Sequence, residues 1–203
     1  MNTVGVYGSP PSRGRLGGYA WGPLTRFGVV VALIVCVIDQ ASKLWLLNVF
    51  DLANRGVVHI TPFLSFVLTW NTGISYGLFP QESDLGRYIL LALKAAAVVV
   101  LWAWLARAEL KLTALALGLI IGGAIGNGID RFVYGAVVDF VLFHITTKSF
   151  NFVWYVFNLA DAAIVAGVIG LLYEYGWGSA PQKRPDPPGR MAEVAPSGAA
   201  KVA

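Results

Sequence analysis

Four aspartates stand inside or beside apolar runs of the sequence: Asp39, Asp130, Asp139 and Asp161. Burying a charge in hydrocarbon costs at least ~2.5–3.5 kcal/mol, so acidic residues in such places are candidates for function. Two carboxyl groups that share one proton supply both a general base and a general acid near neutral pH. The sequence therefore makes an acid–base pair one hypothesis, with helix capping and proton coupling as the alternatives.

The first two of these aspartates have basic neighbours. Asp39 precedes Lys43 by four residues, which is the favourable order for an ion pair on one helical face. Asp130 is followed directly by Arg131, and Asn127 lies three residues before it. We therefore predict that Asp39 and Asp130 belong to structural ion pairs.

The other two aspartates have no basic residue within four positions. Asp139 lies in the run Val137-Val138-Asp139-Phe140, and Asp161 follows Asn158-Leu159-Ala160. In such surroundings the charged form of a carboxyl is disfavoured. We therefore select Asp139 and Asp161 as the candidate pair, while the capping and proton-coupling roles stay open.

The composition places these residues in a membrane protein. The chain has 203 residues, of which 57% are apolar and only 13% charged, and its mean hydropathy is +0.66. Ordinary soluble domains carry about 25% charged residues. This balance also excludes disordered and fibrous proteins, and the single cysteine, Cys36, excludes a disulfide-stapled one.

Four apolar segments each approach the ~20 residues that a helix needs to cross a bilayer. They are residues 24–47, 88–106, 112–129 and 153–173. The second segment contains a single charge, Lys94. Because only helices satisfy their own backbone hydrogen bonds in lipid, we predict an all-α membrane protein with four transmembrane helices in residues 24–175. Residues 1–23 and 176–203 are rich in glycine and proline, which predicts a disordered extension and a disordered tail.

The basic residues favour an orientation with both termini in the cytoplasm. Nine of them fall on the side of the termini and four on the other side. The nine are Arg13, Arg15, Arg26, Arg107, Lys111, Lys183, Arg184, Arg190 and Lys201; the four are Arg55, Arg87, Arg131 and Lys148. In this topology all four aspartates lie at the outer face of the membrane.

The two outer connections differ in composition. Residues 56–70 are rich in β-branched and aromatic residues and are broken by Pro62, which predicts one or two short strands. Asn71-Thr72-Gly73 predicts a tight turn after them. Residues 74–87 contain three hinge candidates (Gly77, Pro80, Gly86) and are predicted to form a lid. Residues 132–152 are predicted to be the second outer loop.

Five blocks in chain order resemble the lipoprotein signal peptidases, a family of membrane aspartyl peptidases. They are Asp39-Gln40-Ala41-Ser42-Lys43, Asn71-Thr72-Gly73-Ile74-Ser75-Tyr76-Gly77, Gly126-Asn127-Gly128-Ile129-Asp130-Arg131, Val137-Val138-Asp139-Phe140 and Phe157-Asn158-Leu159-Ala160-Asp161. The blocks fall within residues 24–175. The chain departs from the family at Ser75-Tyr76, where Ala-Phe is usual, and in a longer, more aromatic segment between Asp139 and Asp161.

The resemblance implies that Asp139 and Asp161 form the catalytic dyad. It also implies that substrate-binding and supporting roles belong to Asn71, Gly73, Asn127, Asp130, Arg131, Asn158, Asp39 and Lys43. The implied reaction is removal of the signal peptide from a diacylglyceryl-modified prolipoprotein in the bacterial inner membrane. The cut falls just before the lipidated cysteine.

The same resemblance sets the expected partners. These are the prolipoprotein, membrane lipid and lipopeptide inhibitors of the globomycin type, with no cofactor, no metal and no nucleic acid. His59 and His144 lie far apart in the sequence without ligand spacing, so we predict a solvated or structural role for each. Ser42-Lys43 does not have the spacing of a Ser–Lys peptidase. The remaining alternative from another class is a small proton-coupled transporter or channel subunit.

Overall fold

The structure is a computed structural model that describes residues 20–72, 84–147 and 149–177. Most of the predicted terminal segments and of the predicted lid at residues 74–87 therefore lie outside the described residues. The described end of the lid segment, residues 84–87, belongs to a helix instead, and residues 176 and 177 continue the last helix rather than beginning a tail.

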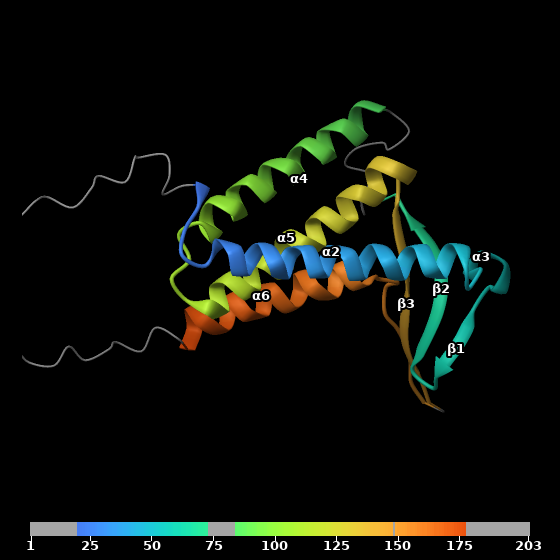
Figure 1. Ribbon diagram of the computed structural model, residues 1–203. Helices are drawn as coiled ribbons and strands as arrows, with labels where there is room; N and C mark the ends of the chain where they lie inside the picture. The colour runs from blue at the N-terminus through green and yellow to red at the C-terminus, as the bar shows by residue number, and fades with distance from the viewer. Residues whose placement is uncertain (1–19, 73–83, 148, 178–203) are drawn as a thin grey trace, which may run out of the picture.

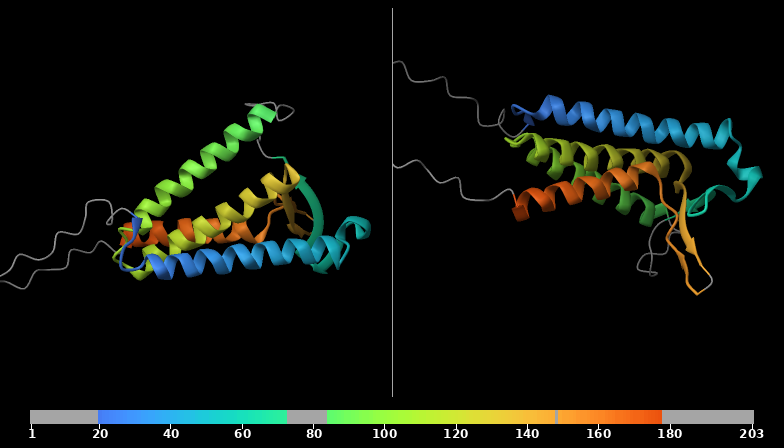
Figure 2. Two further views of the ribbon diagram at one scale, coloured as in Figure 1. Left: turned by 45° about the horizontal axis from the view of Figure 1, so that its top comes forward. Right: turned by 90° about the horizontal axis from the view of Figure 1, so that it is seen from below.

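Four long helices run side by side in the described part of the chain (Figure 1). They are α2 (Thr25–Asn48), α4 (Asp84–Leu105), α5 (Lys111–Tyr134) and α6 (Leu159–Trp177), and a single-turn helix, α3 (Leu52–Arg55), follows α2. Helix α5 is central, because it packs against α2, α4 and α6. Figure 2 shows α4 leaning away from α2 and α6 toward the end of the bundle that carries the strands.

Three of these helices are long and apolar enough to cross a membrane: α2, α5 and α6 over Leu159–Gly176. Large apolar side chains of α2 such as Leu33, Val37 and Ile38 are exposed, as lipid-facing residues are. The apolar part of α4 is shorter and covers Leu91–Leu105. The predicted membrane fold is thus confirmed for three helices, while the fourth crossing stays a prediction.

The boundaries of two apolar segments were predicted wrongly. Residues 151–153 form a strand, and α6 begins only at Leu159, because the side chain of Asn158 caps it. Helix α5 continues five residues past the predicted end and stops at Tyr134. The next residue, Gly135, has a φ of 77°, a left-handed conformation that glycine adopts without strain.

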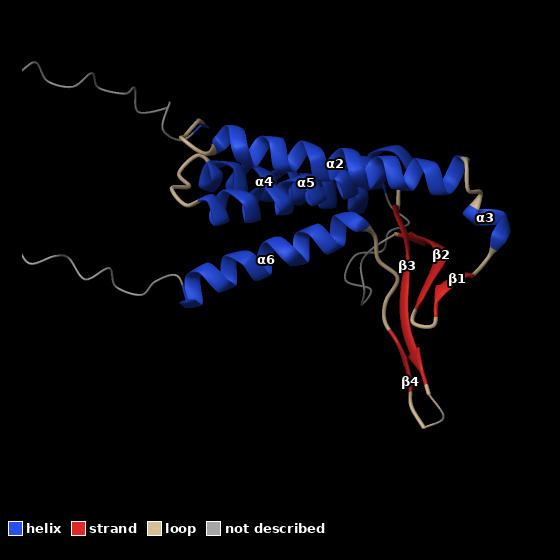
Figure 3. Ribbon diagram, turned by 60° about the horizontal axis from the view of Figure 1, so that its bottom comes forward, coloured by secondary structure: helices blue, strands red, loops and turns tan. Residues whose placement is uncertain are grey.

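A four-stranded antiparallel sheet lies across one end of the helix bundle (Figure 3). Its strands are β1 (Val58–Thr61), β2 (Leu64–Asn71), β3 (Val137–Thr146) and β4 (Asn151–Val153), in the order β1-β2-β3-β4. The two strands flanking Pro62 were predicted. The expectation that the strands are confined to the first outer loop was wrong, because β3 and β4 come from the second one. Strand β3 pairs with β2, which lies far away in the sequence, and β4 pairs with β3. The contact between β2 and β3 is non-local and leaves no local signal.

A small apolar core fixes the sheet on the bundle. Leu46 of α2 and Leu52 of α3 are buried against Phe140 and Val141 of β3. Asp139 directly precedes these two core residues. The packing of the sheet therefore sets the position of this aspartate relative to the helix ends.

Glycines of α5 allow its neighbours to approach closely, and this gives a stability prediction. A Cβ atom on Gly122 would lie 2.5 Å from the carbonyl oxygen of Ala32 in α2, whereas one on Gly128 would meet nothing within 4 Å. We expect Gly122→Ala to lower the free energy of unfolding by about 1–3 kcal/mol through overpacking. Gly128→Ala is the matched control and should be neutral or stabilising by about 0.5–1 kcal/mol. Thermal unfolding in detergent micelles compares the two; equal stability would contradict this description of the helix contact.

Candidate active site

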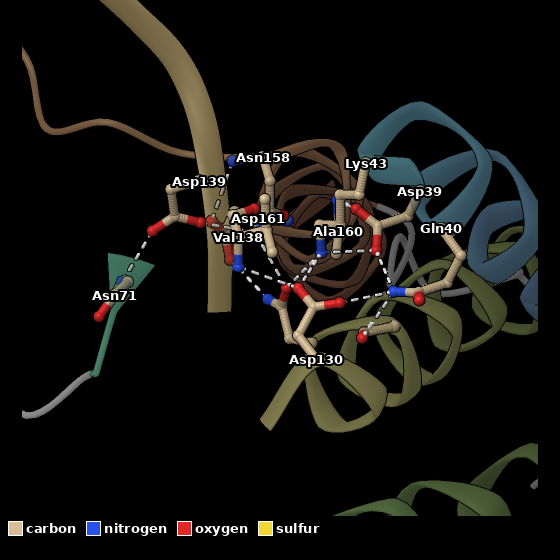
Figure 4. A network of polar contacts seen from close by, with 12 residues as sticks. Asp39, Gln40, Lys43, Asn71, Asp130, Val138, Asp139, Asn158, Ala160 and Asp161 are labelled. Carbon is tan, nitrogen blue, oxygen red and sulfur yellow. Dashed lines mark hydrogen bonds and ion pairs between the residues drawn. The ribbon is translucent and has the colours of Figure 1, made fainter. Parts of the chain in front are cut away.

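The predicted site residues that the structure describes converge where the sheet meets the ends of three helices (Figure 4). Asp39 and Lys43 come from α2, Asn127, Asp130 and Arg131 from α5, Asn71 from β2, Asp139 from β3, and Asn158 and Asp161 from the start of α6. Gly73 lies outside the described residues. Asn71 is the last residue of β2, and the predicted tight turn over Asn71-Thr72-Gly73 extends beyond the described residues.

One half of this network is a buried ion cluster. The ammonium group of Lys43 lies 2.7 Å from Asp39 Oδ2 and 2.7 Å from Asp130 Oδ2. All three side chains are almost fully buried, with exposed fractions of 2%, 0% and 0%. The predicted Asp39–Lys43 pair is confirmed. The cation beside Asp130 is Lys43 of a different helix rather than the adjacent Arg131, so that part of the prediction was wrong.

The ion cluster also holds the start of α6. Asp39 Oδ1 accepts a hydrogen bond of 3.0 Å from the backbone N–H of Ala160, in the first turn of the helix. Asp130 Oδ2 accepts one of 3.1 Å from the N–H of Val138, which precedes Asp139. Two of the four aspartates thus anchor the backbone segments that carry the other two.

Asn158 and Asp161 cap α6 reciprocally. The N–H of Asp161 donates to Asn158 Oδ1 at 3.0 Å, and the N–H of Asn158 donates to Asp161 Oδ2 at 3.2 Å. This is a capping box, in which two otherwise unpaired backbone donors are satisfied. The i, i+3 spacing of these two residues is visible in the sequence. The box restricts the rotamer of Asp161 before any ligand binds.

Asn158 also links the two aspartates of the candidate pair. Its side-chain Nδ2 donates to Asp139 Oδ1 at 2.6 Å, while its Oδ1 is held by Asp161. The second carboxylate oxygen of Asp139 accepts from Asn71 Nδ2 at 2.8 Å. Both Asp139 oxygens are therefore positioned by asparagines, from β2 and from the start of α6.

Asn127 connects the ion cluster to Asp161. Its Nδ2 donates to Asp161 Oδ1 at 2.8 Å, and its Oδ1 accepts from Lys43 Nζ at 3.2 Å and from Asn158 Nδ2 at 3.0 Å. A single continuous hydrogen-bond network therefore joins all four aspartates. Such networks fix one geometry when every member is satisfied.

Arg131 shows a different pattern. One terminal nitrogen, Nη1, donates to the backbone oxygen of Thr72 at 3.1 Å. Its Nε is buried and has no hydrogen-bond partner among the described residues. A buried unpaired donor is costly, and at a binding site it is available to an incoming acceptor.

Sequence reasoning missed one member of the network, Gln40. Its Nε2 lies 2.8 Å from Asp130 Oδ1, 3.0 Å from the Gly126 oxygen and 3.3 Å from Asp39 Oδ2. The only signal for it was its position beside Asp39 in the first block.

The two histidines were also not expected to meet. The hydroxyl of the buried Ser65 lies 2.8 Å from His59 Nδ1 and 2.9 Å from His144 Nε2.

Burial raises the pKa of Asp139 to about 6, and the nearby Asp161 carboxylate adds to the rise, against the hydrogen bonds from Asn71 and Asn158. The folded protein therefore holds this proton more tightly than the unfolded chain does. The stability contributed by protonated Asp139 is present below about pH 4 and is lost as the pH rises through about 6, with a magnitude of about 3 kcal/mol.

The raised pKa of Asp139 predicts that the difference in thermal stability between the wild type and Asp139→Asn changes with pH. Relative to Asp139→Asn, which does not ionise, the wild type should lose thermal stability as the pH rises from about 4 to about 7. The measurement is the difference between the two unfolding temperatures across this range in one detergent. A difference that stays constant with pH would show that Asp139 keeps the ordinary pKa of an aspartate.

Comparison with known proteins gives the family of the chain. The family described as signal peptidase (SPase) II matches residues 31–176, most of the chain. The chain belongs to this family. It is 62% identical over 149 residues to the lipoprotein signal peptidase of Nitrobacter hamburgensis, covering 73% of this chain and 91% of that protein. It is 54% identical over 160 residues to that of Rhodopseudomonas palustris strain TIE-1, covering 79% and 98%.

Solved structures show the same fold. Two bacterial membrane enzyme structures, at 1.9 Å and 2.3 Å resolution, superpose with TM-scores of 0.59 and 0.58 at 23% identity. The alignments cover 77% and 79% of this chain and 96% and 94% of theirs. The protein is thus a membrane peptidase of the signal peptidase II family. The proton-coupled transporter is not favoured.

Proposed function

We propose that this signal peptidase II removes the signal peptide from diacylglyceryl-modified prolipoproteins, cutting just before the lipidated cysteine, with Asp139 and Asp161 as the catalytic dyad. The assignment of the dyad rests on the hydrogen bonds of Asn158. One asparagine side chain binds Asp139 through Nδ2 and the backbone of Asp161 through Oδ1, so the two carboxyl groups share a positioning residue. The comparisons with lipoprotein signal peptidases support the reaction class.

The surroundings of the two aspartates favour different protonation states. Asp161 lies in the first turn of α6, where the helix dipole stabilises a negative charge. Asp139 is on a strand, is 1% exposed and has its pKa raised to about 6 by burial. We therefore assign the ionised role to Asp161 and the protonated role to Asp139.

Hydrolysis then needs no covalent intermediate. Asp161 takes a proton from a water molecule held between the carboxyl groups, and the resulting hydroxide attacks the scissile carbonyl carbon. Asp139 donates its proton to the carbonyl oxygen, which gives a gem-diol. Asp161 passes its proton to the leaving nitrogen, a hydroxyl of the gem-diol returns a proton to Asp139, and the C–N bond breaks.

The remaining polar residues act on these two groups or on the substrate. Asn71, Asn127 and Asn158 position the carboxyl oxygens. The unpaired Nε of Arg131 is proposed to donate to a backbone carbonyl of the substrate. Asp39, Lys43 and Asp130 support the site by holding the backbone at Ala160 and Val138.

The same proposal extends to topology. We place α4 as the fourth crossing in the bacterial inner membrane, with both termini in the cytoplasm and the dyad at the outer face. A lipid-bearing substrate then reaches the dyad laterally from the outer leaflet, and globomycin-type lipopeptides are expected to occupy the same site. The peptidase domain is proposed to span residues 24–175, flanked by cytoplasmic terminal segments.

The test is cleavage by the purified protein. Incubation with a diacylated prolipoprotein should produce a faster-migrating band on a denaturing gel, and the lipopeptide inhibitor should abolish it. The same precursor without the diacylglyceryl group is the control. No shift with the diacylated precursor would contradict the proposed function, and equal cleavage of both precursors would contradict the proposed lipid requirement.

A further inference from the structure

An apolar groove between α4 and α5 contains one charge. It has a volume of about 510 Å³, and Leu91, Lys94, Val98, Ile125, Gly128 and Phe132 are among its lining residues. The other members of the lining are apolar as well. Figure 1 shows α4 and α5 running toward the sheet that carries Asp139.

Lys94 makes no hydrogen bond or ion pair that would stabilise the described part of the fold. Within that part of the chain no hydrogen-bond acceptor or ion-pair partner is found for its ammonium group. The charges of Arg131, Asp161, Asp130 and Lys43 act on it only through longer-range electrostatics, Arg131 most strongly. A lysine among apolar residues at membrane depth is expensive, and such residues generally serve a ligand or a transport path.

The ammonium group of Lys94 is not at the middle of the groove but nearer the end beside the sheet. Side chains on a helix lean toward its N-terminus, and on α4 this is the end nearest the sheet. The deeper lining, from Ala95 to Val99 and at Ala124 and Ile125, is entirely apolar. Along α5 the groove runs from Phe132 to Ala124, about 12 Å at 1.5 Å per residue. Leu91 lies on the sheet side of Lys94, so the ammonium group is nearer the end of the groove beside the site than the end toward the membrane centre. One polar group near the site followed by an apolar stretch fits an acyl ester.

We infer that this groove binds one acyl chain of the substrate's diacylglyceryl group and that Lys94 donates a hydrogen bond to its ester carbonyl oxygen. The inference rests on the proposed function, because the ester belongs to the lipid on the substrate cysteine. Lys94 is then a specificity residue rather than a catalytic one. It distinguishes an ester-linked chain from a chain that offers no carbonyl acceptor.

The experiment compares two synthetic lipopeptides that differ only at the linkage. One carries a dipalmitoylglyceryl cysteine and the other its dihexadecyl ether analogue, which lacks the carbonyl oxygens. A hydrogen bond to a charged donor is expected to give the wild type about a tenfold to a hundredfold higher kcat/KM for the ester. Lys94→Met should cleave the ester more slowly and the ether at the wild-type rate, so that the preference disappears.

Lys111→Met is the matched control, because Lys111 is exposed at the opposite end of α5. It should keep the wild-type preference for the ester. An ester preference that survives in Lys94→Met, or a wild type without such a preference, would overturn the inference. A wild type that cleaves neither lipopeptide would overturn the proposed function, and the groove assignment with it.

A second variant tests the groove itself. A side chain on Gly128 points into open space, so Gly128→Leu fills the groove without meeting the rest of the protein at its Cβ. It should lower kcat/KM for the dipalmitoyl substrate by about tenfold and leave that for a diacetylglyceryl analogue nearly unchanged. Equal effects on the long-chain and short-chain substrates would contradict acyl binding in this groove.

Discussion

Asp139→Asn and Asp161→Asn are each expected to lower the rate of prolipoprotein cleavage by about 10²- to 10⁴-fold or more, because each removes one partner of the acid–base pair. An amide neither accepts the proton of the attacking water nor donates one to the carbonyl. The amide also has nearly the same size as the carboxyl, so folding and membrane insertion should be retained. Single-turnover cleavage of a diacylated precursor measures the effect.

A control variant separates chemistry from hydrogen bonding. Asn71→Ala removes one hydrogen bond to Asp139 but leaves both carboxyl groups, so its loss of rate should be smaller than that of Asp139→Asn. The variants are compared at equal amounts of folded protein, judged by thermal unfolding. Substantial turnover by either aspartate variant would rule out the dyad.

Lys43→Met should have the largest effect on stability. It leaves Asp39 and Asp130 buried at 0% exposure without their shared cation. Removing one partner of a buried ion cluster costs about 3–5 kcal/mol, so most of the protein should fail to fold or should unfold at a much lower temperature. Folded yield and the unfolding temperature in detergent measure the loss.

The activity of the surviving Lys43→Met protein tests the supporting role of this residue. The folded fraction should turn over substrate at near the wild-type rate, because Lys43 contacts no carboxyl oxygen of Asp139 or Asp161 directly. The exposed Lys111→Met serves as the control for a lost positive charge. Normal yield and stability combined with no activity would instead place Lys43 in the reaction.

The features that the sequence predicted correctly are those encoded by residues close together in the chain. The apolar segments and the Asp39–Lys43 spacing are local patterns, and the helices and the ion pair confirm them. The pairing of Lys43 with Asp130 joins residues of two helices, and strand β3 depends on pairing with the distant β2. No pattern within a short window encodes such contacts.

Asn158 lies between these two cases. Its spacing to Asp161 is that of a capping box, a local signal that the predicted helix start at residue 153 did not use. Its contact with Asp139 depends on how the sheet is seated on the helices, which the core around Phe140 determines. The choice of Asp139 and Asp161 rested on missing basic neighbours, and the three-dimensional network is what relates the two residues to each other.

The most direct test of the dyad mechanism is mass spectrometry of the enzyme and its products during turnover. In water enriched in oxygen-18, the signal peptide should be released with one labelled oxygen in its new carboxyl group, and the other product should begin with the lipidated cysteine. The mass of the enzyme should stay unchanged, because an activated water attacks the carbonyl directly. An enzyme adduct with the mass of the signal peptide, or a cut at another bond, would contradict this account.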